Sequence, residues 1–194
     1  MLNSAIAILH DEHRSLAAIV HGLKYLIREV REKGRSPDFK LIWAMIYYID
    51  AFPERLHHPK ENVYLFARLR LRTHEADCVL DDLEKQHAEG AKQVRALEHA
   101  LGYYEAGKPD GFRVFAAAVE SFSDNTLQHM NTEERIVIPL AKKYLLPEDW
   151  VEIAHAFGEN GDPRFGTEPD HEFRNLFSRI VNLAPPPIGV GPAT

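Results

Sequence analysis

The sequence contains a single cysteine, Cys78, among its 194 residues. One cysteine excludes an intramolecular disulfide framework and any zinc or iron–sulfur site built from several cysteines. No apolar run approaches the roughly 20 residues that a membrane-spanning helix needs. The first residues, MLNSAIAILHDEHRS, have no basic segment and carry charge early, which is untypical of a secretory signal peptide. These absences predict a cytoplasmic protein that does not bind a membrane.

Basic residues are also not in excess, since the net charge is −6. A nucleic-acid partner is not expected, because such proteins usually carry a basic stripe. Hydrophobic residues make up 45% of the chain and charged residues 27%, which is ordinary for a soluble globular protein. Histidine is abundant, with eleven copies. The pattern leaves the oligomeric state open, although the aromatic residues after position 144 are compatible with a dimer.

No stretch alternates with a period of two residues, so the sequence predicts no sheet. Apolar residues instead recur every three or four positions, as on one face of a helix. Gly34 is expected to end the first helix, with Ser36 and Pro37 as N-cap and first residue of the next. Four such faces lie within residues 2–30, 38–72, 80–104 and 115–144. Four long helices with short connections predict an all-α, up-down-up-down four-helix bundle.

The pattern changes after Tyr144. Pro147 is expected to begin a short fifth helix, followed by a loop, a further helical piece and the proline-rich tail APPPIGVGPAT. We therefore predict a bundle domain over residues 1–145 and a C-terminal extension over residues 146–194 that packs on it. His171 lies in this extension, and the sequence does not define its role.

Four histidines are spaced symmetrically about the predicted turns. The midpoints of the pairs 13/57, 57/87 and 87/129 fall at residues 35, 72 and 108, each inside an independently predicted break. Residues equidistant from a tight turn lie at the same height in an antiparallel bundle, because both helices rise by about 1.5 Å per residue. The sequence therefore predicts one layer of inward-facing histidines: His13, His57, His87 and His129.

Two glutamates join this layer. Glu61 and Glu133 each follow a predicted layer histidine by one helical turn and lie on the same helix face. Burying so many polar groups without partners would cost about 1–3 kcal/mol each. Metal ions remove this cost, since neutral imidazole and carboxylate are both ligands. Six ligands exceed the needs of one tetrahedral zinc and match two ions with shared carboxylates, with iron, manganese or zinc all compatible.

Three further residues are candidates for supporting roles. His58, next to His57, is expected to orient a ligand or to serve as an alternative one. Glu84 and Glu134 are candidates to accept a hydrogen bond from a ligand imidazole. Pro59 lacks an N–H and clashes with a preceding carbonyl, so it is expected to disrupt the helix between His57 and Glu61 and to direct both side chains.

The segments LHDEH, FPERLHHPKENVYLFARL, LEKQH and HMNTEERIVIPLAKKYL resemble the hemerythrin-like HHE cation-binding domain family over about residues 5 to 145. The resemblance implies a four-helix bundle around a non-haem di-iron centre, with bridging carboxylates and a bridging oxo or hydroxo group. Carried over by position, it implies the same six ligands: His13, His57, Glu61, His87, His129 and Glu133.

The sequence departs from the oxygen-carrying hemerythrins in two places. These proteins have a second histidine one turn after the third-helix ligand, where this chain has Ala91. They also place an aspartate five residues after the fourth-helix histidine, whereas Glu133 follows His129 by four. With one imidazole fewer, the centre resembles the four-histidine, two-glutamate centres of bacterial proteins linked to oxygen, nitric oxide or peroxide responses.

The first functional hypothesis is a di-iron protein that binds or reacts with O2, NO or peroxide, in a stress-response or sensing role. The second is a metal-responsive sensor or an iron storage or delivery module with little turnover. The third is a structural bundle whose histidines are satisfied without metal. The residues do not decide whether the protein is an enzyme.

Overall fold

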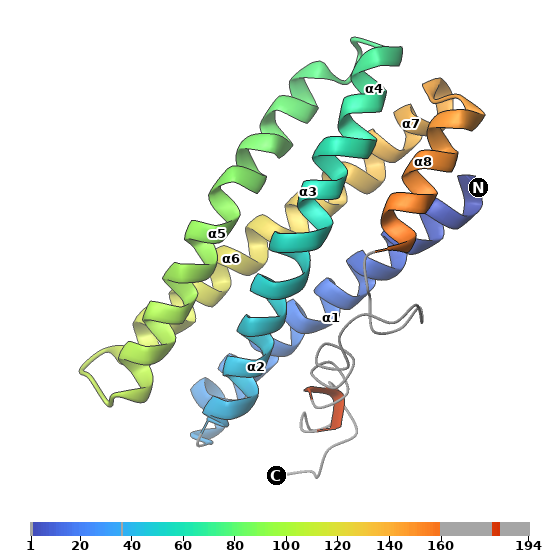
Figure 1. The fold of residues 1–194 in the computed structure, drawn as a ribbon. Coiled ribbons are helices and arrows are strands. Elements are labelled where there is room, and N and C mark those ends of the chain that lie inside the picture. Colours follow the sequence, from blue (N-terminus) through green and yellow to red (C-terminus); the bar gives the residue numbers. More distant parts are fainter. Residues whose placement is uncertain (1, 36, 160–179, 183–194) are drawn as a thin grey trace.

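The computed structural model describes residues 2–35, 37–159 and 180–182. Four helical rods run alternately up and down (Figure 1). They are α1 (Leu2–Lys33); α2 (Phe39–Ile49) continued by η1 (Asp50–His57), α3 (His58–Lys60), η2 (Glu61–Phe66) and α4 (Ala67–Arg72); α5 (Asp77–Glu105); and α6 (Gly111–Thr132) continued by η3 (Glu133–Val137) and α7 (Ile138–Tyr144). The described residues contain no strand. The predicted all-α four-helix bundle is confirmed.

The first connection shows how local sequence ends one rod and starts the next. Gly34 has a positive φ of 63° and donates its N–H to the carbonyl of Val30, which ends α1. The next helix is capped by Asp38, whose side chain accepts the N–H of Leu41 at 3.1 Å. The predicted cap, Ser36, lies outside the described residues. The helix therefore begins at Phe39, two residues later than the predicted cap and proline imply.

The segments η1, η2 and η3 are π-helical, and prolines accompany them. Pro53 lies inside η1, while Pro59 and Pro139 each lie two residues after a π-helical segment ends. A proline cannot donate the usual helical hydrogen bond and its ring clashes with a preceding carbonyl, and a wider turn relieves both problems. The helix is irregular around Pro59, as the sequence predicts. The irregularity nevertheless begins at Asp50, so Pro59 is not its only cause.

Two apolar clusters fill the bundle above and below its middle. One contains residues such as Leu16, Ile46, Leu97 and Phe115, and the other contains Leu9, Phe66, Leu83 and Val137. On α1 the clusters are separated by a short polar stretch between Leu9 and Leu16. The core is therefore interrupted where the sequence places its histidines.

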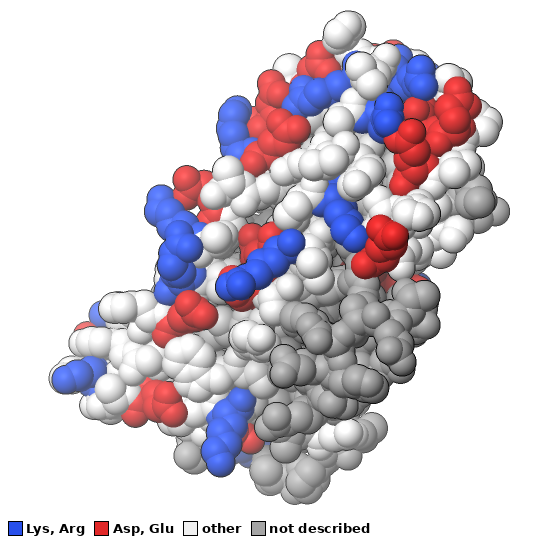
Figure 2. All heavy atoms as spheres, viewed as in Figure 1, with Lys and Arg blue, Asp and Glu red and all other residues white. Residues whose placement is uncertain are grey.

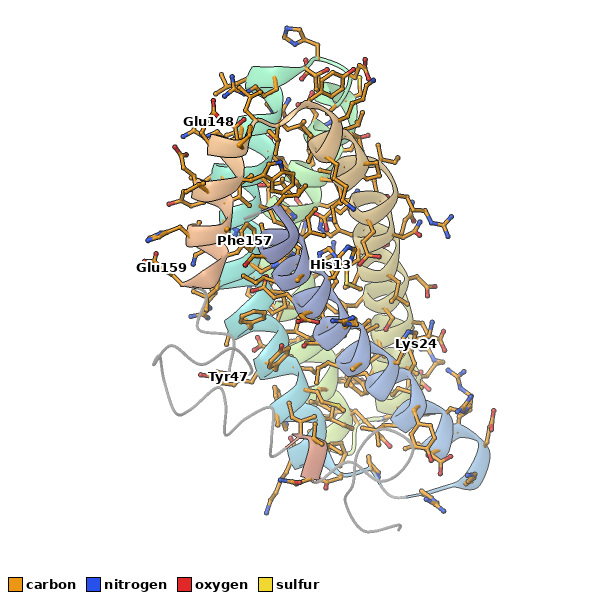
Figure 3. The ribbon with its side chains drawn as sticks, turned by 90° about the vertical axis from the view of Figure 1, so that its right-hand side faces the viewer. His13, Lys24, Tyr47, Glu148, Phe157 and Glu159 are labelled. Atoms are coloured by element: carbon orange, nitrogen blue, oxygen red, sulfur yellow. The ribbon has the colours of Figure 1, made fainter. Side chains whose placement is uncertain are left out.

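The helix α8 (Pro147–Gly158) lies against α1 (Figures 1 and 3). Its buried residues Trp150, Ile153 and Phe157 extend one apolar cluster of the bundle. In addition, Lys60 donates a hydrogen bond from Nζ to the carbonyl of Ala156 at 2.6 Å. Most of the predicted extension, including His171, lies outside the described residues.

The buried carboxylate of Asp149 ties α8 to α4. It accepts two hydrogen bonds from Arg72, at 2.8 and 3.0 Å, and a third from the N–H of Leu146. Arg72 holds the pKa of Asp149 below its usual range. The ionised carboxylate therefore stabilises the fold above its unfolded pKa of about 3.9, and this contribution is lost as pH falls through the lower pKa of the folded state.

We expect Asp149→Asn to lower the free energy of unfolding by about 1–3 kcal/mol at pH 7. Denaturant titrations should show this difference shrinking towards pH 3, and a constant difference would contradict it.

Charges of both signs are intermixed on the exposed face shown in Figure 2. Several pair across helices; Arg70 on α4, for example, contacts Asp81 at 2.8 Å and Glu84 at 3.1 Å on α5. Within the described ranges, no helix is long and apolar enough to cross a membrane.

Candidate metal centre

The structure brings all six sequence-predicted ligands into one layer between the two apolar clusters. The four histidines come from four different rods, and α1 carries His13 at mid-height (Figure 3). Glu61 begins η2 and Glu133 begins η3, so the π-helical turns set the position of both carboxylates. Both glutamates are only 1% exposed. Such deep burial of six polar side chains calls for partners inside the layer.

Glu61 lies between the two halves of the layer. Its Oε1 atom is 3.1 Å from Nε2 of His57 and 3.8 Å from Nε2 of His13. Its Oε2 atom faces the other half, 3.5 Å from Nε2 of His87. One carboxylate thus turns one oxygen towards each histidine pair.

Glu133 has the same arrangement from the opposite rod. Its Oε2 atom is 3.3 Å from Nε2 of His13, and its Oε1 atom is 3.3 Å from Nε2 of His129 and 4.0 Å from Nε2 of His87. The Nε2 atoms of His87 and His129 are 3.0 Å apart. The layer therefore has two halves, His13 with His57 and His87 with His129, and both carboxylates span them.

The outer nitrogen of each layer histidine meets an oxygen from a neighbouring rod. Each contact joins Nδ1 to a side-chain oxygen: His57 to Glu12 at 2.5 Å, His87 to Asn62 at 2.7 Å, His129 to Gln86 at 2.9 Å and His13 to Glu134 at 3.2 Å. These contacts join the first rod to the second, the second to the third, the third to the fourth, and the fourth back to the first. A closed ring of hydrogen bonds therefore surrounds the layer and turns every Nε2 inwards, as outer partners of metal-bound histidines do.

Sequence reasoning missed three of these acceptors: Glu12, Asn62 and Gln86. Each is a direct sequence neighbour of a predicted ligand, just as Glu134 is, and this is the signal that could have found them. Glu84 needs correction, because it contacts Arg70 at the surface instead of an imidazole. Nδ1 of His87 already contacts Asn62, and Nε2 of His87 faces the interior of the layer, so neither ring nitrogen is left for Glu84.

The buried carboxylates and imidazoles of the layer shift one another's pKa values. Burial lowers the pKa of His57, but the carboxylates of Glu61 and Glu12 outweigh burial and raise the pKa to about 10. Burial and Glu61 raise the pKa of Glu133, yet the neighbouring histidines outweigh both and lower it to about 2. Burial dominates at His87 and lowers its pKa to about 3. His87 is therefore neutral at pH 7, the form in which imidazole binds metal.

The buried atoms without a hydrogen-bond partner show whether a metal fits here. They include Nε2 of His13 and all four carboxylate oxygens of Glu61 and Glu133. Two groups of side chains place potential ligand atoms within 4.8 Å of one another: His13, His57 and Glu61, and His58, Glu61, His87 and His129. Glu61 belongs to both groups. The donor set fits two cations that share carboxylates, since these cations would satisfy all four unpartnered carboxylate oxygens of Glu61 and Glu133.

Residues 4–141 match a family model described as hemerythrin HHE cation binding domain. The match covers well over half of the chain and contains all six predicted ligands. No curated protein and no solved structure matches the chain significantly.

Proposed function

Because the chain belongs to the hemerythrin HHE cation-binding family, we propose that it is a non-haem di-iron protein that binds or reacts with O2, NO or peroxide. The observation that carries this proposal is the pair of buried carboxylates of Glu61 and Glu133. Their four oxygens have no hydrogen-bond partner, and each carboxylate directs one oxygen towards each half of the layer. His13 and His57 would hold one iron, His87 and His129 the other, and Glu61 with Glu133 would be shared. A role in a stress response or in sensing follows from the small, reactive ligands proposed.

Bound iron would supply the redox chemistry and the open coordination position, while the protein sets geometry and access. A cavity of about 240 Å³ adjoins the second half of the layer. Its walls include His87 and His129 but neither His13 nor His57. Amide side chains, among them Gln93 and Asn125, line the same cavity. A small ligand would therefore approach from the side of His87 and His129.

The test is elemental analysis and absorption spectroscopy of protein expressed with ample iron. We expect two irons per chain and the near-ultraviolet absorption of an oxo-bridged di-ferric centre. The protein should then be reduced without air and exposed separately to O2, NO and hydrogen peroxide, with a spectral change expected for at least one. A colourless protein without iron would overturn the proposal.

A second candidate function is a metal-responsive sensor or an iron storage or delivery module with little turnover. The contacts between α8 and the ligand-bearing turn favour it, because Phe157 lies edge-on to His57 with ring centroids 5.9 Å apart and Lys60 bonds to Ala156. It predicts that metal removal changes the rate of proteolysis after residue 145, with no measurable turnover of the three ligands. Rapid turnover would favour the first function.

The ring of hydrogen bonds provides a further prediction. Glu12→Leu removes the acceptor for Nδ1 of His57, and we expect the affinity for iron to fall by about 10- to 100-fold, the usual effect of losing such a partner. Glu12→Gln is the matched control, because an amide oxygen still accepts this hydrogen bond. Anaerobic titration with Fe2+ measures both variants, and equal affinities for Glu12→Leu and the wild type would contradict the role of the ring.

A further inference from the structure

His58 lies at the start of α3 and faces the same interior as the predicted ligands, with a side chain 12% exposed. Its ring stacks on that of His87, with centroids 4.3 Å apart and planes 12° from parallel. The centroids of His58 and His129 are 5.3 Å apart, and those of His87 and His129 are 4.7 Å apart. Three imidazoles therefore form a compact triangle on one side of Glu61.

The ring nitrogens of His58 agree with this placement. A potential ligand atom of His58 lies within 4.8 Å of those of Glu61, His87 and His129. Its Nδ1 atom is buried without a hydrogen-bond partner, and its nearest charged contact is Oε2 of Glu54 at 3.5 Å. The layer histidines also turn Nδ1 towards an oxygen acceptor. His58 differs in two ways: the carboxylate oxygen that faces its Nδ1 comes from its own rod, one turn earlier, and it forms no hydrogen bond with that nitrogen.

The helix α5 provides the space that this arrangement needs. Gly90, one turn after His87, is buried, and a Cβ atom there would lie 2.0 Å from Oε2 of Glu54. Ala91, which stands where the oxygen-carrying hemerythrins are expected to have a second histidine on the third helix, is exposed and does not face the layer. The third rod therefore offers no second imidazole, and its glycine admits the carboxylate that accompanies His58.

We propose that His58, after its ring turns out of the stack on His87, is a third imidazole ligand of the metal ion held by His87 and His129, and that Glu54 orients it. The centre would then have five histidines and two glutamates, with three imidazoles on one ion and two on the other. This inference rests on the proposed function, because it assumes that the layer holds two ions.

The first experiment compares anaerobic binding of Co2+ and of Fe2+ to the wild type and three variants. We expect His58→Ala to weaken binding of one of the two ions by more than the 10- to 100-fold typical of losing an outer hydrogen-bond partner, and Glu54→Gln to stay within about that range. His99→Ala removes an exposed histidine and should change nothing. Added imidazole should restore binding to His58→Ala, because His58 forms part of the wall of the 240 Å³ cavity. Unchanged binding of both ions in His58→Ala would overturn the inference.

The second experiment uses the wild type alone and therefore does not depend on how a variant folds. The protein is labelled with 15N-histidine and loaded with Co2+, and the hyperfine-shifted ring N–H resonances are counted. Five ligand imidazoles support the inference, whereas four overturn it and leave the proposed function standing. If the wild type binds fewer than two ions, the proposed function itself fails.

Discussion

Replacing Glu61 with alanine is expected to remove both metal ions from the protein. Glu61 is the residue common to both groups of candidate ligands, and its two oxygens face different histidine pairs. Each ion would therefore lose a charged ligand in the same substitution, whereas loss of any one histidine affects mainly one ion. Iron per chain, measured after anaerobic loading and desalting, should fall from two to none.

The matched control is Glu84→Ala. Glu84 is also a helical glutamate near the layer in sequence, but it is half-exposed and contacts Arg70. This variant should keep both ions. Two irons retained by Glu61→Ala would contradict the shared role of this carboxylate, and loss of iron from Glu84→Ala would show that the measurement reports general damage to the bundle.

The height of the layer was predictable because glycine and proline mark the turns of this chain. Once Gly34 and the break around Gly107 are located, the constant rise of a helix places His13, His57, His87 and His129 together. The apolar residues on both sides of these histidines show approximately which face of each helix points into the core. Regular geometry and hydrophobic periodicity are enough for this part of the fold, and the family match agrees with it.

The partners of the histidines were not predictable in the same way. Whether Glu12 contacts a neighbouring rod depends on the rotation of each helix about its own axis, to within a fraction of a turn. The π-helical segments change this rotation locally, and the sequence shows only the prolines inside or beside them, such as Pro53 and Pro59. For the same reason, the sequence alone does not show that the inward-facing position one turn after His87 is Gly90 and not Ala91. Residues three and four positions apart lie on almost the same face.

Removing the metal from the loaded protein is expected to produce a large loss of thermal stability. Two buried carboxylates would again be without hydrogen bonds, at the level where the two apolar clusters are separated. An ion present at 1,000 times its dissociation constant stabilises the folded state by about 4.1 kcal/mol. For a chain of this size, that corresponds to a fall in Tm of about 8–16 °C for each ion removed.

Differential scanning calorimetry with and without a chelator measures this change. Glu61→Ala is the appropriate control, because a variant that holds no metal should have the same Tm in both conditions. Comparing the two proteins separates metal binding from effects of the chelator on the bundle. If the wild type also has the same Tm in both conditions, the layer is satisfied without metal. That result would support the hypothesis of a structural bundle whose histidines need no metal. A large shift confined to the wild type would show that this polar layer is stable because it binds metal, since its carboxylates have no other hydrogen-bond partners within the described part of the chain.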